Sequence, residues 1–179
     1  MKFFETSYSF NSSWDATTLA CWRKYPNDKT PHVKHVEILS RELDPTTGIL
    51  KTERLIIVSQ NVPRIITKMV GAQEQAYVLE YSEVDPSSKT LTLRSTNLTM
   101  KNFLAVTEHI TYTPLESDPE KTIFKQNAVL SADGMMSRFA TLIEDYSLKV
   151  FKANAIVGKL GFEQVLERIL SEQRAQVPL

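Results

Sequence analysis

The sequence predicts an α+β domain in which a largely antiparallel sheet carries helices at the two ends of the chain. Two observations predict this class. Strand-like segments separated by turn sequences follow one another between residues 32 and 131. Apolar residues recur with helical spacing before these segments and again after them. Because 179 residues, 42% of them hydrophobic, suffice for one core, we predict one domain over residues 1–172 and a tail over residues 173–179.

The elements are expected in the order strand, helix, six strands, long helix. Residues 2–10 read as a strand, and Ser13 is a good N-cap for a helix over residues 13–24 that Pro26 ends. The six strands are expected at residues 32–42, 49–58, 75–84, 89–98, 102–113 and 121–131, the last two joined around residues 114–120.

The last helix has an apolar face that recurs from Met135 to Ile169. Gly158 and Gly161 either bend this helix or let it pack closely. A sheet curved around such a helix encloses a packed core or a cavity, and composition does not decide between them.

Charge and cysteine content exclude several classes of function. Lys plus Arg equals Asp plus Glu at 21 each, which gives no support to nucleic-acid binding. The single cysteine excludes an internal disulfide and multi-cysteine metal sites. We expect no signal peptide, presequence or membrane span, because no apolar run of the required length occurs.

The residues offer little to an enzyme. No nucleotide-binding, nucleophile-elbow or zinc-protease motif is present. His32 and His35 would point to opposite faces of a strand and cannot share a metal ion, and Cys21 lies on an apolar helix face, which is typical of a buried small side chain. The adjacent Glu144 and Asp145 diverge on a helix and are predicted to be solvated. We therefore predict no catalytic residue, no metal and no cofactor.

Two basic features leave alternatives open. Arg23 and Lys24 near the end of the first helix either compensate its dipole or form an anion site. The stretch over residues 61–71 would place Ile65, Ile66, Met69 and Val70 on one helical face, beside Arg64 and Lys68 on another. Burying those four apolar side chains is worth roughly 6 to 12 kcal/mol, so they either cap the core or close a cavity and enter a membrane surface.

Several motifs in this order resemble the PRELI-like family over residues 1 to about 170. They are Lys24-Tyr25-Pro26-Asn27 with Pro31-His32-Val33, Thr52-Glu53-Arg54-Leu55, the loop from Val62 to Gly71, residues 91–99 (LTLRSTNLT), and Glu144-Asp145-Tyr146 with Phe151 and Asn154. The sequences of residues 52–56 and 91–100 resemble those of the slowmo-like branch of the family, which is associated with phosphatidylserine.

The resemblance implies a START-like fold, in which a curved seven-stranded antiparallel sheet, an N-terminal helix, a lid loop and a long C-terminal helix enclose one phospholipid. It implies a carrier that moves phosphatidylserine or phosphatidic acid between the outer and inner membranes across the mitochondrial intermembrane space. Such carriers form a heterodimer with a small helical protein bearing twin cysteine motifs, and they contact anionic membrane surfaces transiently.

The resemblance also assigns residues. Lys24, His32, Arg54 and Asn154 match headgroup positions, and the lid and membrane contact would comprise Val62, Pro63, Arg64, Ile65, Ile66, Lys68, Met69 and Val70. Val58, Asn61, Val150 and Val157 stand where phosphatidic acid carriers of the family tend to have basic residues. Phosphatidylserine is therefore the first expected cargo and phosphatidic acid the second. The alternative is a START-like interaction module whose cavity is filled by its own side chains and which carries no lipid.

Overall fold

The computed structural model describes residues 1–59, 75–132 and 139–175. These contain seven strands and two helices: β1 (Lys2–Phe10), α1 (Trp14–Arg23), β2 (Val33–Leu43), β3 (Leu50–Ser59), β4 (Gln75–Asp85), β5 (Thr90–Asn97), β6 (Ala105–Leu115), β7 (Asp118–Ser131) and α3 (Ala140–Ala175). Each predicted strand is present within a few residues of its expected bounds. The helix α3 continues through the first residues of the predicted tail to Ala175.

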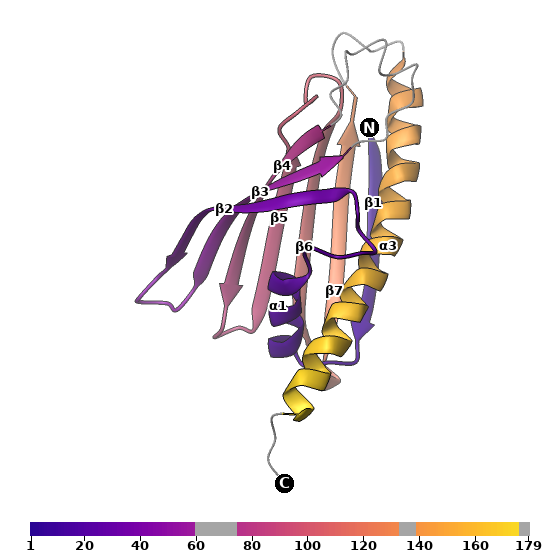
Figure 1. The fold of residues 1–179 in the computed structure, drawn as a ribbon. Helices are drawn as coiled ribbons and strands as arrows, with labels where there is room; N and C mark the ends of the chain where they lie inside the picture. The colour runs from indigo at the N-terminus through magenta and orange to yellow at the C-terminus, as the bar shows by residue number, and fades with distance from the viewer. Residues whose placement is uncertain (60–74, 133–138, 176–179) are drawn as a thin grey trace.

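All seven strands form one antiparallel sheet in the order β1-β7-β6-β5-β4-β3-β2. Only β1 leaves the sequential order, because it pairs with β7 at one edge while β2 forms the other. Both helices lie on the same face of the curved sheet (Figure 1), which we call the inner face. The long helix α3 contacts α1, β1 and β7. The predicted α+β fold is confirmed.

The packed core occupies one end of the inner face. There α1 and the C-terminal half of α3 cover inward-pointing side chains of the sheet, and Trp14 donates a hydrogen bond from its ring nitrogen to the carbonyl of Tyr112 at 3.2 Å. Cys21 is fully buried in this core, as the helical pattern predicted, and burial raises the pKa of its thiol. The core comprises Phe10, Trp14, Ala16, Ala20, Cys21, Leu91, Leu93, Ile110, Tyr112, Phe124, Phe162, Val165, Leu166 and Ile169.

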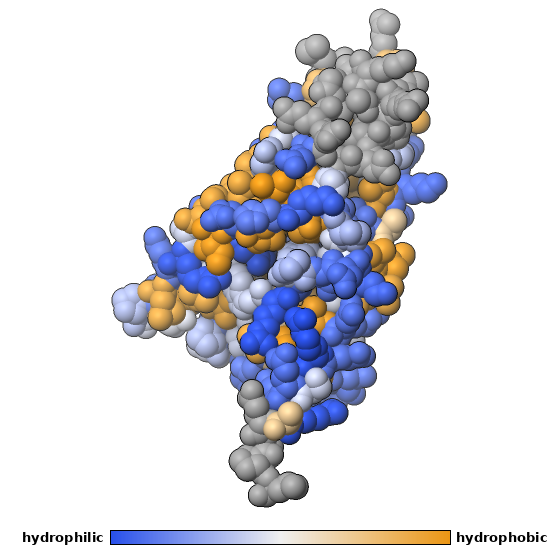
Figure 2. Space-filling view, viewed as in Figure 1, coloured by the Kyte–Doolittle hydropathy of each residue, from blue (hydrophilic) through white to orange (hydrophobic). Residues whose placement is uncertain are grey.

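In contrast to the packed core, the edge strand β2 is exposed along most of its length. Hydrophobic residues lie on both sides of the hydrophilic band that β2 presents in Figure 2, and Ile38, Leu39 and Leu43 are exposed. Two register irregularities interrupt its pairing with β3, a feature that discourages the addition of further strands. No helix in the described ranges is long and apolar enough to cross a membrane.

Two sequence expectations were wrong in detail. The β6–β7 connection is shorter than predicted, since Pro114 lies in β6 opposite Thr122 and β7 begins at Asp118. Glu144 is not solvated: its side chain is buried, accepts the N–H of Ala132 at 2.9 Å and pairs with the Met1 ammonium at 2.5 Å. These two donors hold the pKa of Glu144 below its usual value.

The segment after α1 makes a close contact with α3 on the inner face of the sheet. The Asn27 side-chain amide donates to the carbonyl of Gly161 at 2.9 Å, and its oxygen accepts the N–H of Lys29 at 2.8 Å. A Cβ atom at Gly161 would lie 2.9 Å from the Asn27 Oδ1 atom, closer than side chains approach. Gly161 thus permits this contact, whereas a Cβ at Gly158 would meet nothing within 4 Å.

We predict that Gly161→Ala and Gly158→Ala change stability in different ways. Both substitutions gain helix propensity of about 1 kcal/mol, but only Gly161→Ala displaces Asn27. The free energy of unfolding of Gly161→Ala should therefore lie about 1 to 3 kcal/mol below that of Gly158→Ala in urea unfolding. Equal stability of the two variants would contradict the proposed contact.

Candidate functional site

A cavity of about 240 Å³ lies between the inner face of the sheet and α3, next to the packed core. Its apolar and aromatic walls include Tyr8, Ile56, Val58, Val78, Ile110, Tyr112, Phe124, Phe151 and Phe162. Its polar lining includes Lys24, Asn27, His32, Glu80, Ser95, Glu108, Gln126, Asn154 and Lys159. Apolar walls with a few polar groups are typical of small-molecule sites, whose volumes run from about 300 to 1,000 Å³.

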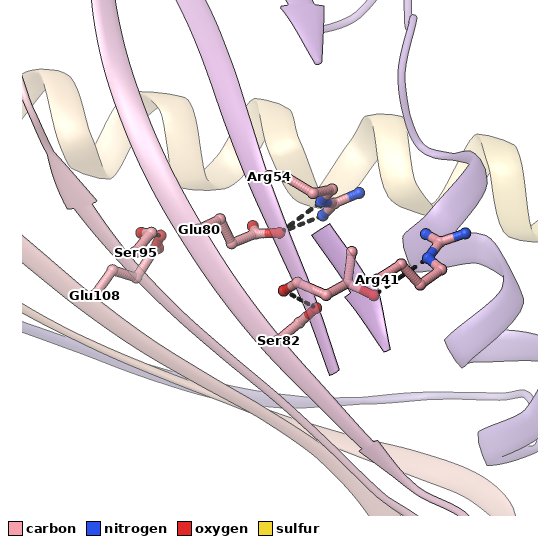
Figure 3. Close-up of polar contacts among 7 residues, drawn as sticks. Arg41, Arg54, Glu80, Ser82, Ser95 and Glu108 are labelled. Atoms are coloured by element: carbon pink, nitrogen blue, oxygen red, sulfur yellow. Dashed lines mark hydrogen bonds and ion pairs between the residues drawn. The ribbon is translucent and has the colours of Figure 1, made fainter. Parts of the chain in front are cut away.

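A row of polar side chains crosses the inner face at the level of this cavity. The strand register places Arg54 of β3 opposite Glu80 of β4, Glu80 opposite Ser95 of β5, and Ser95 opposite Glu108 of β6. Figure 3 shows these four residues across the neighbouring strands. Directly opposite positions share a face, so four consecutive strands present polar groups at one level.

The Arg54–Glu80 pair is the buried end of the row. Arg54 and Glu80 are 4% and 6% exposed, and Glu80 Oε1 accepts from Arg54 Nε at 2.9 Å and also from Nη2. The Arg54 guanidinium also stacks on the Trp22 ring, with its carbon 5.0 Å from the ring centre. Burial opposes its charge, but the Glu80 carboxylate overcomes this and the pKa of Arg54 is raised.

Glu108 carries the other carboxylate of the row. Its Oε2 atom accepts the Ser95 hydroxyl at 3.0 Å, and its Oε1 atom accepts the Gln126 amide. Both donors are neutral. Within the described ranges Glu108 forms no ion pair, so its negative charge has no compensating cation there.

Arg23 and Lys24, which the sequence could not separate, have different surroundings. Arg23 pairs with Glu172 of α3 at 2.9 Å on the surface. Lys24 lines the cavity, where its ammonium lies 4.9 Å from the centre of the Tyr25 ring and makes no ion pair with any described residue. Burial works against its charge, yet the nearby Tyr25, Cys21 and Glu80 raise the pKa of Lys24 overall. Lys24 is therefore a cation available to a ligand.

The other predicted headgroup residues are only partly brought together. His32 and Asn154 line the same cavity as Lys24, from the segment before β2 and from α3. Burial, and then Lys34, lower the pKa of His32, so its neutral form is favoured. Arg54 does not line the cavity and is held behind it by Glu80. Residues 62–70, the predicted lid, lie outside the described residues, and their role stays a prediction.

Sequence reasoning missed Glu80, Ser95, Glu108 and Gln126, although a signal for them exists. Glu108 shares its strand face with the buried Ile110 and Tyr112, and Gln126 shares one with Phe124 and Ala128. Polar residues at inward positions of an alternating strand need partners or a ligand. A search for polar residues that interrupt the apolar face of a strand would have found Glu108 and Gln126.

Comparison with known proteins decides the family. The PRELI-like family model matches residues 15–173. The chain belongs to the PRELI-like family. It is 46% identical over 93% of its length to "Protein UPS2, mitochondrial" of Saccharomyces cerevisiae, 73% of which is covered. It is also 34% identical over 96% of its length to "Protein slowmo homolog" of Dictyostelium discoideum, 75% of which is covered. The predicted family and its slowmo-like branch are confirmed.

Solved structures with low sequence identity share the fold of this PRELI-like chain. A START superfamily protein from Mycobacterium smegmatis matches with a TM-score of 0.53 and 13% identity, covering 91% of this chain and 98% of its own. The ZhuI aromatase/cyclase from Streptomyces matches with a TM-score of 0.60 and 15% identity, covering 98% and 96%. These likenesses establish a START-like fold and carry no information about activity.

We predict that Arg54→Met strongly destabilises the protein, because it leaves the Glu80 carboxylate buried without a cation. Breaking a buried pair costs about 3 to 5 kcal/mol, and the double variant Arg54→Met/Glu80→Met should recover most of it in urea unfolding. Arg41→Met is the control, since the exposed Arg41 stacks on the same Trp22 ring at 4.8 Å without a buried acid. Equal losses in both single variants would contradict a specific role of the pair.

Proposed function

We propose that this protein extracts an anionic glycerophospholipid from one mitochondrial membrane and carries it to the other, with phosphatidylserine as the preferred cargo and phosphatidic acid next. The observation that carries the proposal is a cavity with apolar walls and a cation, Lys24, that makes no ion pair with any described residue, in a START-like fold. The protein works in the mitochondrial intermembrane space, which its family and its mitochondrial relative support. It is a carrier and not an enzyme.

The physical task explains why a cavity is needed. The two tails of a phospholipid contain roughly 30 methylenes, and exposing each to water costs about 0.8 kcal/mol. Passage of a bare lipid between membranes is therefore prohibitively slow. A protein wall of side chains such as Ile56, Val78 and Phe151 replaces the bilayer as the apolar solvent.

The cavity volume indicates which part of the lipid these residues hold. The cavity of about 240 Å³ lies just below the range of about 300 to 1,000 Å³ that is typical of small-molecule sites. We therefore infer that it holds the headgroup and the first carbons of the tails.

We propose further that the protein acts as a heterodimer with a small helical partner bearing twin cysteine motifs, as its family membership supports. Exposed apolar side chains on α3, namely Leu142, Ile156 and Leu160, offer a surface that a helical partner can cover. Co-expression followed by size-exclusion chromatography tests the pairing. A chain that stays monomeric and equally protease-resistant with and without the partner would contradict it.

The first test of lipid transfer is mass spectrometry of lipids extracted from the purified protein, followed by transfer between vesicles. We predict that Lys24→Met lowers the uptake of phosphatidylserine about tenfold, because one hydrogen bond from a charged group is lost. Lys29→Met is the control, since Lys29 is exposed and does not line the cavity.

Three outcomes would change the proposal. Equal uptake by both lysine variants would remove Lys24 from the headgroup site. Phosphatidic acid as the main extracted lipid would keep the carrier and reverse the order of cargo. Absence of any lipid, even after incubation with anionic vesicles, would favour the interaction module.

A further inference from the structure

The cavity contains one positive and one negative group that form no ion pair with any described residue. Lys24 supplies the ammonium and Glu108 the carboxylate. The remaining charges near the cavity are paired: Glu80 with Arg54, and Lys159 with Glu163 at 3.5 Å. A phosphate alone would pair with Lys24 and would supply no cation to Glu108.

We propose that Glu108 is a specificity-determining residue that binds the ammonium group of the cargo headgroup. This inference rests on the proposed carrier function and names the chemical class of its cargo: a glycerophospholipid with a phosphodiester and a primary ammonium. Phosphatidylserine and phosphatidylethanolamine share this chemistry. Phosphatidic acid lacks it.

The geometry around Glu108 prepares it for this role. The Ser95 hydroxyl and the Gln126 amide fix one carboxylate oxygen each, which orients the group without cancelling its charge. Each carboxylate oxygen has further acceptor capacity toward a ligand. A primary ammonium donates three hydrogen bonds, and it would add a charge-assisted contact to a half-buried acid that has no ion pair with any described residue.

Glu108 also supplies a repulsive element against the wrong cargo. The phosphomonoester of phosphatidic acid carries more negative charge than a phosphodiester and would share a cavity with an uncompensated carboxylate. Like charges brought together in a partly dry site cost free energy, and specificity commonly uses such repulsion. Val58, which lines the same cavity, adds no positive charge to offset it.

The test measures lipid extraction by the full chain, with its partner where the two co-purify. Phosphatidylcholine vesicles carry one test lipid each: phosphatidylserine, phosphatidylethanolamine, phosphatidylglycerol or phosphatidic acid. Phosphatidylglycerol is the decisive comparison, because it is a phosphodiester without an ammonium. The wild type should take up at least one ammonium-bearing lipid in preference to phosphatidylglycerol and phosphatidic acid, and the lipid taken up identifies the source of the ammonium.

Glu108→Gln removes the charge and keeps the shape. We expect the ratio of phosphatidylserine to phosphatidic acid uptake to fall about tenfold, the effect of losing one hydrogen bond to a charged group. Glu116→Gln is the matched control, since Glu116 is exposed and lies outside the cavity lining. Its ratio should equal that of the wild type.

A second measurement keeps the inference falsifiable if Glu108→Gln does not fold. Wild-type protein should take up its preferred ammonium-bearing lipid about tenfold better than the same lipid with its amine acetylated, because acetylation removes the positive charge. Unchanged lipid ratios in a folded Glu108→Gln variant, or equal uptake of the amine and its acetylated form, would overturn the assignment. Failure of the wild type to take up any of the four lipids would overturn the carrier function itself and this inference with it.

Discussion

The ion pair between Arg54 and Glu80 determines which charges the cavity can offer to a ligand. Glu80 lines the same cavity as Lys24, and Arg54 is the cation with which this carboxylate pairs. Arg54 donates two hydrogen bonds to Glu80 and itself packs on the Trp22 ring. Lys24 makes no ion pair with any described residue, so its ammonium is available to an anionic group.

The inner face serves two purposes because its two ends are built differently. At one end, α1 and the C-terminal half of α3 pack aromatic side chains such as Phe10, Phe124 and Phe162 into a dry core. At the other end, polar groups at the same inward positions prevent such packing. The contact of Asn27 with Gly161 holds the segment that contains Lys24 and His32 against α3. The position of the cavity follows from where the apolar alternation is interrupted.

Much of the fold could be predicted from the sequence, because alternation and turn chemistry are local. The strands, the two helices and the burial of Cys21 all follow from such patterns. Glu144 was misjudged since its partners, Ala132 and Met1, are distant in sequence and invisible to a local pattern. The partner of Arg54 is equally invisible to a local pattern. The motif identified Arg54, but only the strand register shows that Glu80, on the next strand, lies opposite it and pairs with it.

For a lipid carrier, the free energies of transfer indicate that polar contacts with the headgroup, such as those proposed for Lys24 and Glu108, decide which lipid is bound. Lipid tails leave one apolar solvent, the bilayer, and enter another, so their large transfer free energies nearly cancel. The tails therefore determine that a lipid must be enclosed, but they barely distinguish one headgroup from another. A tenfold preference needs only about 1.4 kcal/mol, which a single charge-assisted hydrogen bond can supply. Under the proposed function, one ammonium and one carboxylate that form no ion pair with any described residue suffice for such a preference. Because these contacts are few, they also allow the headgroup to be released at the target membrane.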